Sequence, residues 1–482
     1  MAGIGFQLKR LFDREGLVGR VQAISYASMV TVGPILSCML AVAFIHWLLV
    51  SHRAPFLARE LFQGGTSYAF AFSFIVTGPF SMWLTRLASD QLYENMHDQL
   101  LPTFYRSLQI TMLCAVVPAI LFLLLVPLTF GEKLSLFILY MELVVIWMEV
   151  VYVSAMKAYR RIANAFAGGM GLAVISTWLY IWLAAEQVSA AGLFACLAVG
   201  FLLTAAVLLW EIERFFRTPY SHASYELGKE FRKYPSLKLI GLCTSISMFE
   251  HQFAQWVFNG VWLKDTFLLS PEYDVATYYA VLSVLPTLVW FAVSVETAFY
   301  PKFRQYYDLI LGKGTIHDID RARNEMEKVL FGELARMMGI QFAFSLVSVA
   351  CGIRFLPYIG FTAQMIDTFN ILVMAFYVYI MTSIMVLLLL YFDDRKGAGV
   401  LAVIFLVSNI TASILLRDEQ YQGLSLFAAS FPLLIATIAR LVFRLRQLHY
   451  ATFSAQPLYE RKGLDVRVKS GHQPTFQGKG VG

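Results

Sequence analysis

Residues 189–210 read SAAGLFACLAVGFLLTAAVLLW and contain no charged side chain. A helix needs about 20 consecutive apolar residues to cross the hydrocarbon core of a bilayer, so this stretch is long enough to span a membrane. Comparable stretches begin near Gln22, Ser67, Leu108, Leu134 and Ile162 before it, and near Lys238, Ala276, Leu334, Phe369, Ala398 and Gly423 after it. We therefore predict an all-α, polytopic membrane protein with about 12 transmembrane helices in two six-helix bundles.

The composition agrees with a membrane protein and argues against a soluble one. Of the 482 residues, 58% are hydrophobic and 15% are charged, whereas soluble proteins have about 45–50% and 25%. The five cysteines are odd in number, show no paired spacing and lie within or at the ends of apolar runs, so we expect neither disulfides nor a metal site. No P-loop, HExxH or Gly-x-Ser-x-Gly motif is present. The sequence thus favours a protein that is not an enzyme and has no cofactor.

The basic residues indicate an orientation. If all twelve segments span, 32 of the 38 Lys and Arg fall in the segments on one side and 6 in the loops on the other. Because Lys and Arg accumulate on the cytoplasmic side, we predict that both termini are cytoplasmic. The net charge of +6 is then explained by orientation and a cytoplasmic docking face, without nucleic acid as a partner.

The chain divides into five parts on this basis. We expect a cytoplasmic amphipathic helix (1–21), a first transmembrane half (22–210), a basic cytoplasmic connector (211–237), a second half (238–445) and a basic cytoplasmic tail (446–482). A charged helix is also predicted over Asp318–Arg336, where Arg321 and Arg323 each precede a glutamate by four residues.

Prolines interrupt several predicted spans. A proline within a membrane helix frees backbone groups that neighbouring helices must satisfy, and broken helices form central sites and hinges in many transporters. An ordinary kink is the alternative at each position. The best hinge candidates are Gly33, Pro34, Gly78, Pro79 and Pro286.

Four glutamates are predicted inside the spans: Glu142, Glu149, Glu250 and Glu296. A charge at the bilayer centre costs about 2.5–3.5 kcal/mol on insertion scales, so these side chains are expected to face inward. Glu142 and Glu149 are seven residues apart and share one helix face. Either at least one carboxylate binds a cation, a proton or substrate, or all four are protonated and hydrogen-bond neighbouring helices.

Aromatic residues cluster in two places of the second half, around Trp256 and around Trp290. Sugar rings can pack on such side chains, so a glycan pathway is one interpretation. Interfacial aromatic belts and ordinary packing are the other.

Three strings in the sequence are long and unusual. They are residues 1–11 (MAGIGFQLKRL), residues 77–93, which include Thr77-Gly78-Pro79, Arg86 and Asp90, and residues 295–307 (VETAFYPKFRQYY), followed by Gly314-Thr315-Ile316. They resemble the PelG family, inner-membrane transporters of bacterial Pel exopolysaccharide export. Arg86, Asp90 and Glu296 lie in these matching strings. Arg86 and Asp90 could form an i,i+4 pair, as a cytoplasmic latch or a plain helix-end anchor.

The resemblance implies a fold and a function. The fold would be that of lipid-linked oligosaccharide flippases and multidrug antiporters, with two pseudosymmetric bundles around a central cavity. The function would be transport of a nascent, N-acetylgalactosamine-rich polysaccharide across the bacterial inner membrane, made by a cytoplasmic glycosyltransferase and assisted by other membrane components. Alternatives are a cation-coupled antiporter, a flippase of lipid-linked oligosaccharide, and a non-transporting scaffold for the synthase.

Overall fold

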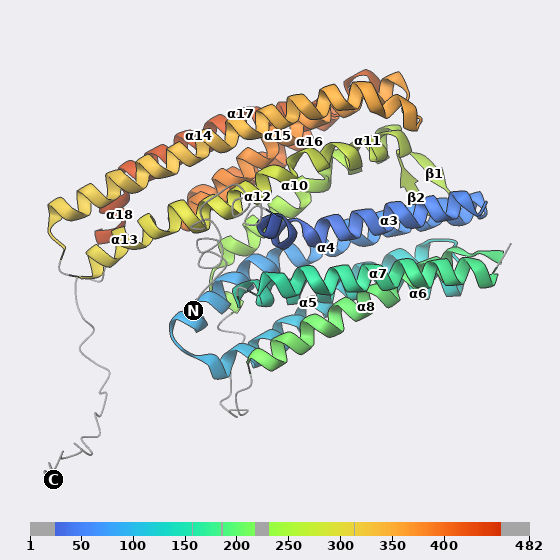
Figure 1. The fold of residues 1–482 in the computed structure, drawn as a ribbon, viewed down its shortest axis with the longest axis horizontal. Coiled ribbons are helices and arrows are strands. Elements are labelled where there is room, and N and C mark those ends of the chain that lie inside the picture. The colour runs from blue at the N-terminus through green and yellow to red at the C-terminus, as the bar shows by residue number, and fades with distance from the viewer. Residues whose placement is uncertain (1–24, 157, 185–186, 217–230, 313, 455–482) are drawn as a thin grey trace, which may run out of the picture.

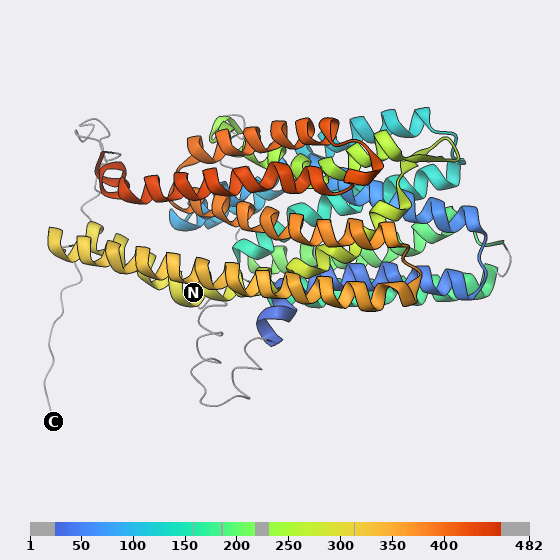
Figure 2. The same cartoon turned by 90° about the horizontal axis from the view of Figure 1, so that it is seen from above.

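The computed structural model describes residues 25–156, 158–184, 187–216, 231–312 and 314–454, without the side chains of Glu296, Glu419 and Ala451. The predicted amphipathic helix over 1–21, residues 217–230 of the connector and most of the tail lie outside the described residues. Two bundles of antiparallel helices lie side by side (Figures 1 and 2). The predicted all-α membrane fold is therefore confirmed.

The first half contains six long helices. They are α3 (Gly33–Ser51), α4 (Phe56–Tyr93), α5 (His97–Leu125), α6 (Phe130–Ala155), α7 (Tyr159–Ala184) and α8 (Ala190–Phe215). Large apolar side chains on their outer faces are exposed, such as Leu125 at 85% and Trp182 at 71%. Exposed apolar surface on this scale would be a liability in water, and it is the surface that lipid covers.

The second half begins with α10 (Pro235–Asn259) and continues with α14 (Ile316–Phe355), α15 (Ala363–Tyr391), α16 (Arg395–Leu415) and α17 (Leu424–Arg446), before the short α18 (Leu448–Ser454). Among the described residues, 11 helical segments are long and apolar enough to cross a membrane. Helix α10 is not among them because it carries Lys238, Glu250 and His251, but its 25 residues are long enough to span. About twelve transmembrane helices are consistent with this count.

The second span of the second half is a broken helix. It comprises α11 (Pro271–Val281), the 3₁₀ turn η2 (Leu282–Val284), α12 (Leu285–Ser294), the π-helical turn η3 (Val295–Phe299) and α13 (Tyr300–Leu311). The break after η2 coincides with Pro286, in the first turn of α12, since proline has no N–H to continue the preceding helical hydrogen bonds.

At the other two predicted hinges, one proline begins a helix and the other lies inside a continuous helix. Pro34 lies in the first turn of α3, and residues 25–31 form a separate helical segment before it that points away from the bundle (Figure 2). Pro79 lies within α4, whose 38 residues form one uninterrupted helix.

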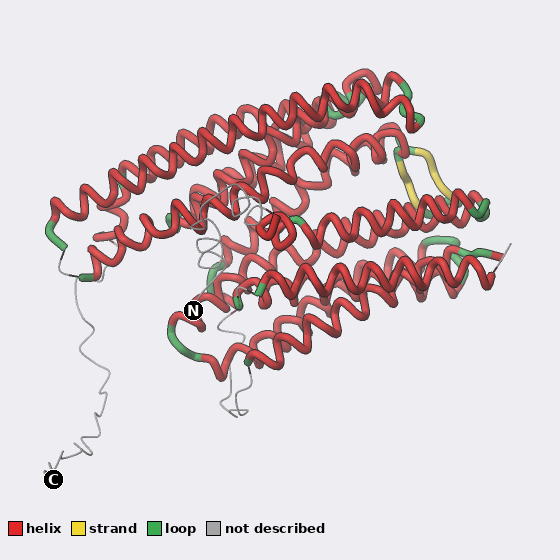
Figure 3. The backbone as a smooth tube through the Cα atoms, viewed as in Figure 1, coloured by secondary structure: helices red, strands yellow, loops and turns green. Residues whose placement is uncertain are grey.

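Among the described residues, one two-stranded sheet lies between α10 and α11 in the chain. Strands β1 (Val261–Leu263) and β2 (Phe267–Leu269) pair antiparallel, with Trp262 opposite Leu268 (Figure 3). Lys264 and Asp265, the central residues of the turn closed by the hydrogen bond from the Thr266 amide to the Leu263 carbonyl, both have positive φ, as in the type I′ turns that match the twist of a hairpin. We call the end of the molecule that carries this sheet the hairpin end, and the opposite end, where α8 leads towards α10, the connector end.

Helix α14 is the longest element, with 40 residues. At 1.5 Å per residue it is about 60 Å long, twice the hydrocarbon thickness of about 30 Å. It extends past the other helices at the connector end together with α13 (Figure 2). Arg321 pairs with Glu325 at 3.5 Å and Arg323 with Glu327 at 2.8 Å, which confirms the predicted charged helix. Thr315 and Asp318 form the capping box at its start.

At the connector end, Asp394 serves two elements. Its carboxylate accepts a hydrogen bond from the Gly397 amide at 3.1 Å, which caps α16, and bonds from Arg440 of α17 at 2.7 and 3.0 Å. Burial by itself would raise the pKa of Asp394, but the hydrogen bonds from Arg440 and Gly397 lower it below its ordinary value. The ionised form is therefore the one that the fold stabilises.

We expect Asp394→Asn to lower the stability of the purified protein at pH 7 by about 1–2 kcal/mol, a modest cost because asparagine still caps the helix. Since the folded pKa lies below the unfolded value of about 3.9, the stabilisation is complete above that pH and is lost as the pH falls through the folded pKa. The melting temperatures of the two proteins should differ at pH 7, and the difference should shrink as the pH falls below the unfolded value of about 3.9. A constant difference across this range would contradict the assignment.

Candidate functional site at the contact between the two halves

The two halves approach most closely where α4 crosses α10. A Cβ atom added to Gly78 would lie only 2.8 Å from the carbonyl oxygen of Gly241, and a Cβ added to Gly241 would collide with the backbone of Gly78. Only glycine allows two helix backbones to pass this closely, as in other membrane helix pairs with small residues at the contact. Gly78 is thus half of a glycine contact between the halves.

At the hairpin end, Tyr68 of α4 binds the sheet. Its hydroxyl donates to the Leu268 carbonyl at 3.0 Å and accepts from the Leu268 amide at 3.1 Å. The Tyr68 ring also stacks on Trp256 of α10, with centroids 4.9 Å apart and planes 4° from parallel. Trp256, Phe267 and Leu269 are buried in the hydrophobic core of the first half. We call this set of contacts the hairpin clasp.

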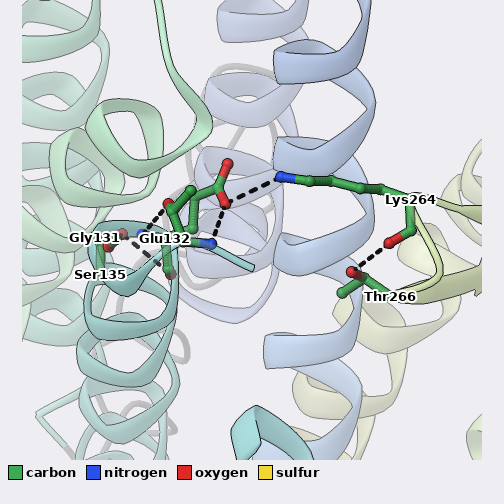
Figure 4. A network of polar contacts seen from close by, with 6 residues as sticks. Gly131, Glu132, Ser135, Lys264 and Thr266 are labelled. Carbon is green, nitrogen blue, oxygen red and sulfur yellow. Dashed lines mark hydrogen bonds and ion pairs between the residues drawn. The ribbon is translucent and has the colours of Figure 1, made fainter. Parts of the chain in front are cut away.

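An ion pair adds to the hairpin clasp. Lys264 in the hairpin turn lies 3.4 Å from Glu132 at the start of α6 (Figure 4). Glu132 also accepts from the Thr129 amide at 2.8 Å and forms the capping box of α6. Glu132 is only 8% exposed, so one buried carboxylate both caps α6 and binds Lys264 of the hairpin turn.

At the connector end, Arg86 and Asp90 of α4 form the predicted i,i+4 pair at 3.1 Å. The Tyr234 hydroxyl, at the residue before α10, donates to Asp90 at 2.8 Å. Arg395 at the start of α16 lies over the Tyr234 ring, 5.0 Å from its centroid. This connector tie joins the end of α4 to the beginnings of two helices of the second half.

A second pair of helices also joins the halves. The Tyr278 hydroxyl of α11 donates to the Met39 carbonyl of α3 at 2.6 Å. The contact between the halves therefore has a glycine crossing in the middle and hydrogen-bonded contacts towards each end.

The buried carboxylates lie on different sides of this contact. Glu149 of α6 is 0% exposed, and neither of its oxygens has a hydrogen-bond partner among the described residues. The same holds for one oxygen of Glu142, which is half-buried. Glu250 of α10 accepts from Ser413 of α16 at 3.2 Å. The structure does not bring Glu250 together with the α6 pair through any hydrogen bond among the described residues.

The remaining predicted site residues have distinct surroundings. Glu296 lies in the π-helical turn η3, but its side chain is outside the described residues. Trp256 is 4% exposed and belongs to the hairpin clasp, whereas Trp290 of α12 is half-buried with an indole nitrogen that lacks a partner among the described residues. No group of three His, Cys, Asp or Glu in the described part of the chain could hold a metal ion.

Sequence reasoning missed a polar cluster beside the hairpin clasp. Asp274 of α11 accepts from the Trp256 indole at 2.9 Å and from Gln252 at 3.2 Å. His251 and the Tyr273 hydroxyl are 2.8 Å apart, and both residues are buried. The polar residues of α10 at three- and four-residue spacing were the available signal, whereas Asp274 precedes the predicted span that begins near Ala276.

Comparisons with solved structures show the fold. The chain is similar to an outward-facing multidrug resistance MATE family transporter of the MOP superfamily, with 15% identity, a TM-score of 0.57 and coverage of 93% of this chain and 99% of that one. A variant of the Vibrio cholerae MATE transporter VcmN has 10% identity, a TM-score of 0.63 and the same coverage. A MOP superfamily transporter from Pyrococcus furiosus has 14% identity, a TM-score of 0.54 and coverage of 89% and 95%.

A comparison with curated proteins found no match. The sequence profile of the PelG family, described as "Putative exopolysaccharide Exporter (EPS-E)", matches residues 1–453. This range includes all three of the strings that resemble the family in the sequence. The match covers nearly the whole chain, and the chain is therefore a member of the PelG family of exopolysaccharide exporters with a MATE-like fold.

Proposed function

We propose that this protein passes a nascent, uncharged hexosamine polymer, rich in N-acetylgalactosamine, from a cytoplasmic glycosyltransferase through the bacterial inner membrane. In this proposal both termini are cytoplasmic, the connector end faces the cytoplasm and the hairpin end faces the periplasm, in agreement with the distribution of Lys and Arg. Membership of an exporter family supports transport of a polysaccharide.

One observation supports a path between the halves more than any other. The halves touch closely at Gly78 and Gly241 and are held at the ends by the hairpin clasp and the connector tie. Backbone contact without side chains lets two helices pivot. The hydrogen bonds at the two ends are each worth about 0.5–1.5 kcal/mol and can be broken one set at a time, although opening the hairpin clasp also exposes the buried side chains of Phe267 and Leu269. Opening the hairpin clasp would release the chain to the periplasm.

The test uses inverted inner-membrane vesicles that contain this protein and its glycosyltransferase. With UDP-N-acetylgalactosamine supplied outside, transport predicts polymer that accumulates inside and resists an added glycosidase until detergent is present. Vesicles with the synthase alone are the control. Polymer that stays sensitive to the glycosidase in both preparations would overturn the proposal.

A second candidate, a cation-coupled antiporter or flippase, is favoured by Glu149. A carboxylate with 0% exposure and two oxygens that have no partner among the described residues must bind a proton or a cation to remain within the membrane. Polymer accumulation that stops when proton and sodium gradients are collapsed would favour this mechanism. Accumulation that is indifferent to both gradients would favour polymerisation as the driving force.

We also predict that Glu296→Gln reduces secreted polymer several-fold without removing the protein from the membrane. Glu296 lies in a π-helical turn between α12 and α13, and such turns occur frequently at functional sites. Secretion should be compared with the level of protein in isolated membranes. Normal secretion would refute a direct role for this carboxylate.

A further inference from the structure

A polar cavity of about 950 Å³ opens at the hairpin end of the second half. Its walls are the last turn of α10, the first turns of α15 and the loop between α16 and α17. Ligand pockets in proteins span about 300–1,000 Å³, so this cavity has room for a ligand larger than a single sugar ring.

The lining differs from that of a drug pocket. Sites for drug-sized molecules are lined mainly by hydrophobic side chains, whereas Phe258 and Ile371 are the two apolar residues among the ten that line this cavity. The others carry amide, carboxyl, guanidinium or hydroxyl groups. Planar groups that both donate and accept hydrogen bonds match the hydroxyl and acetamido groups of a saccharide, and the 40% exposed Phe258 ring offers a face for the C–H side of a sugar.

Some of the polar side chains in the lining form hydrogen bonds within the protein, and others form none with the described residues. The Asn259 amide donates to Gln255 at 2.9 Å and to the Arg417 carbonyl at 3.0 Å, and Gln422 accepts from Thr368 at 3.3 Å. In contrast, the exposed side chains of Asp367, Arg417 and Asp418 make no hydrogen bond or ion pair with other described residues. The cavity therefore combines polar side chains held in place by hydrogen bonds, Asn259 and Gln422, with charged side chains that can still bind a ligand.

The charge of the lining limits the kind of saccharide. Asp367 and Asp418 outnumber Arg417, so the described lining has a formal charge of −1. An anionic sugar would place its carboxylate beside these two unpaired carboxylates, and such repulsion discriminates against a ligand. A neutral sugar meets no such cost.

We infer that this cavity is a saccharide subsite that binds a short stretch of an uncharged, N-acetylated hexosamine chain. The inference rests on the proposed function, because the bound saccharide is the polymer under export. A subsite at the hairpin end holds the chain where it leaves the membrane and opposes its return to the path.

The test is binding to the purified full-length protein in lipid nanodiscs, measured by calorimetry with an N-acetylgalactosamine tetrasaccharide and a galacturonate tetrasaccharide as probes. The neutral probe should bind, and Asp367→Ala combined with Arg417→Ala should weaken its binding at least tenfold. Asp265→Asn is the matched control, because Asp265 is a hairpin-end aspartate in the β1–β2 turn and asparagine tolerates its positive φ. The uronate should bind weakly to the parent protein and more tightly to Asp367→Asn.

Unchanged affinity in the double variant, or preference for the uronate, would overturn the subsite. The vesicle assay separates the two proposals. Polymer accumulation in vesicles without binding of the tetrasaccharide contradicts the subsite alone, whereas binding without accumulation contradicts transport and leaves the subsite in place.

Discussion

Cysteines at Gly64 and Leu269 should abolish polysaccharide secretion in oxidising conditions, and a membrane-impermeant reductant should restore it. Gly64 of α4 lies under β2, where an added Cβ would be 2.8 Å from the Leu269 Cδ1 atom. Replacing Leu269 by cysteine removes that atom, so the pair has room for a disulfide, which needs Cβ atoms about 3.5–4.5 Å apart. The bond would lock the hairpin clasp. The five native cysteines are replaced by serine in the background protein.

The structure offers a matched control for this lock. A Cβ on Gly131 would lie 3.6 Å from the Ala191 Cβ, which suits a disulfide between α6 and α8, within the first half and at the same end. Cysteines at these positions should form a bond and leave secretion normal. If the Gly64 and Leu269 pair is oxidised in full and secretion continues, the hairpin clasp does not open during export. That result would also favour a scaffold, which needs no path.

Gly241→Leu should reduce secretion to background. A leucine side chain cannot fit where a single Cβ would already meet the Gly78 backbone, so the helices must separate. Overpacking of well-packed sites costs about 1–3 kcal/mol, and here the displacement lies at the pivot between the halves. The purified variant should melt at a lower temperature, while its level in membranes, measured by immunoblot, stays high enough to compare.

The control for this substitution is Gly168→Leu. Gly168 is an exposed glycine of α7 with no neighbouring atom within 4 Å of an added Cβ, so the same change there should leave secretion and melting unaffected. A milder variant, Gly78→Ala, should give an intermediate defect. Normal secretion in Gly241→Leu would exclude the glycine crossing as a functional contact.

The spans could be predicted because a membrane-spanning helix requires about 20 consecutive, mainly apolar residues, which are visible in the sequence. Even α10, which carries Lys238, Glu250 and His251, was predicted as a span that begins near Lys238. The ion pairs of α14 were predictable for a similar reason, since residues four apart in a helix are neighbours whatever the tertiary fold.

The contacts between the halves could not be predicted in the same way. Gly78 was a hinge candidate beside Pro79, but its partner Gly241 lies in the other half of the chain, and one sequence contains no sign of their pairing. The hairpin has strands of three residues each, too short for an alternating pattern to be recognised. Glu132 and Asp274 precede the predicted spans that begin near Leu134 and Ala276, and burial by a distant segment leaves no local pattern that would reveal their roles.

The hairpin has a consequence for how the protein is made. Phe267 and Leu269 fill the core of the first half, yet they are synthesised after all six of its helices. During translation the six helices of the first half are therefore inserted before the side chains that complete their core, those of Phe267 and Leu269, have been synthesised. Folding of the first half thus depends on synthesis of part of the second half. Chains that end between α8 and β2 would leave a cavity in the core of the first half and would be candidates for degradation by membrane quality control.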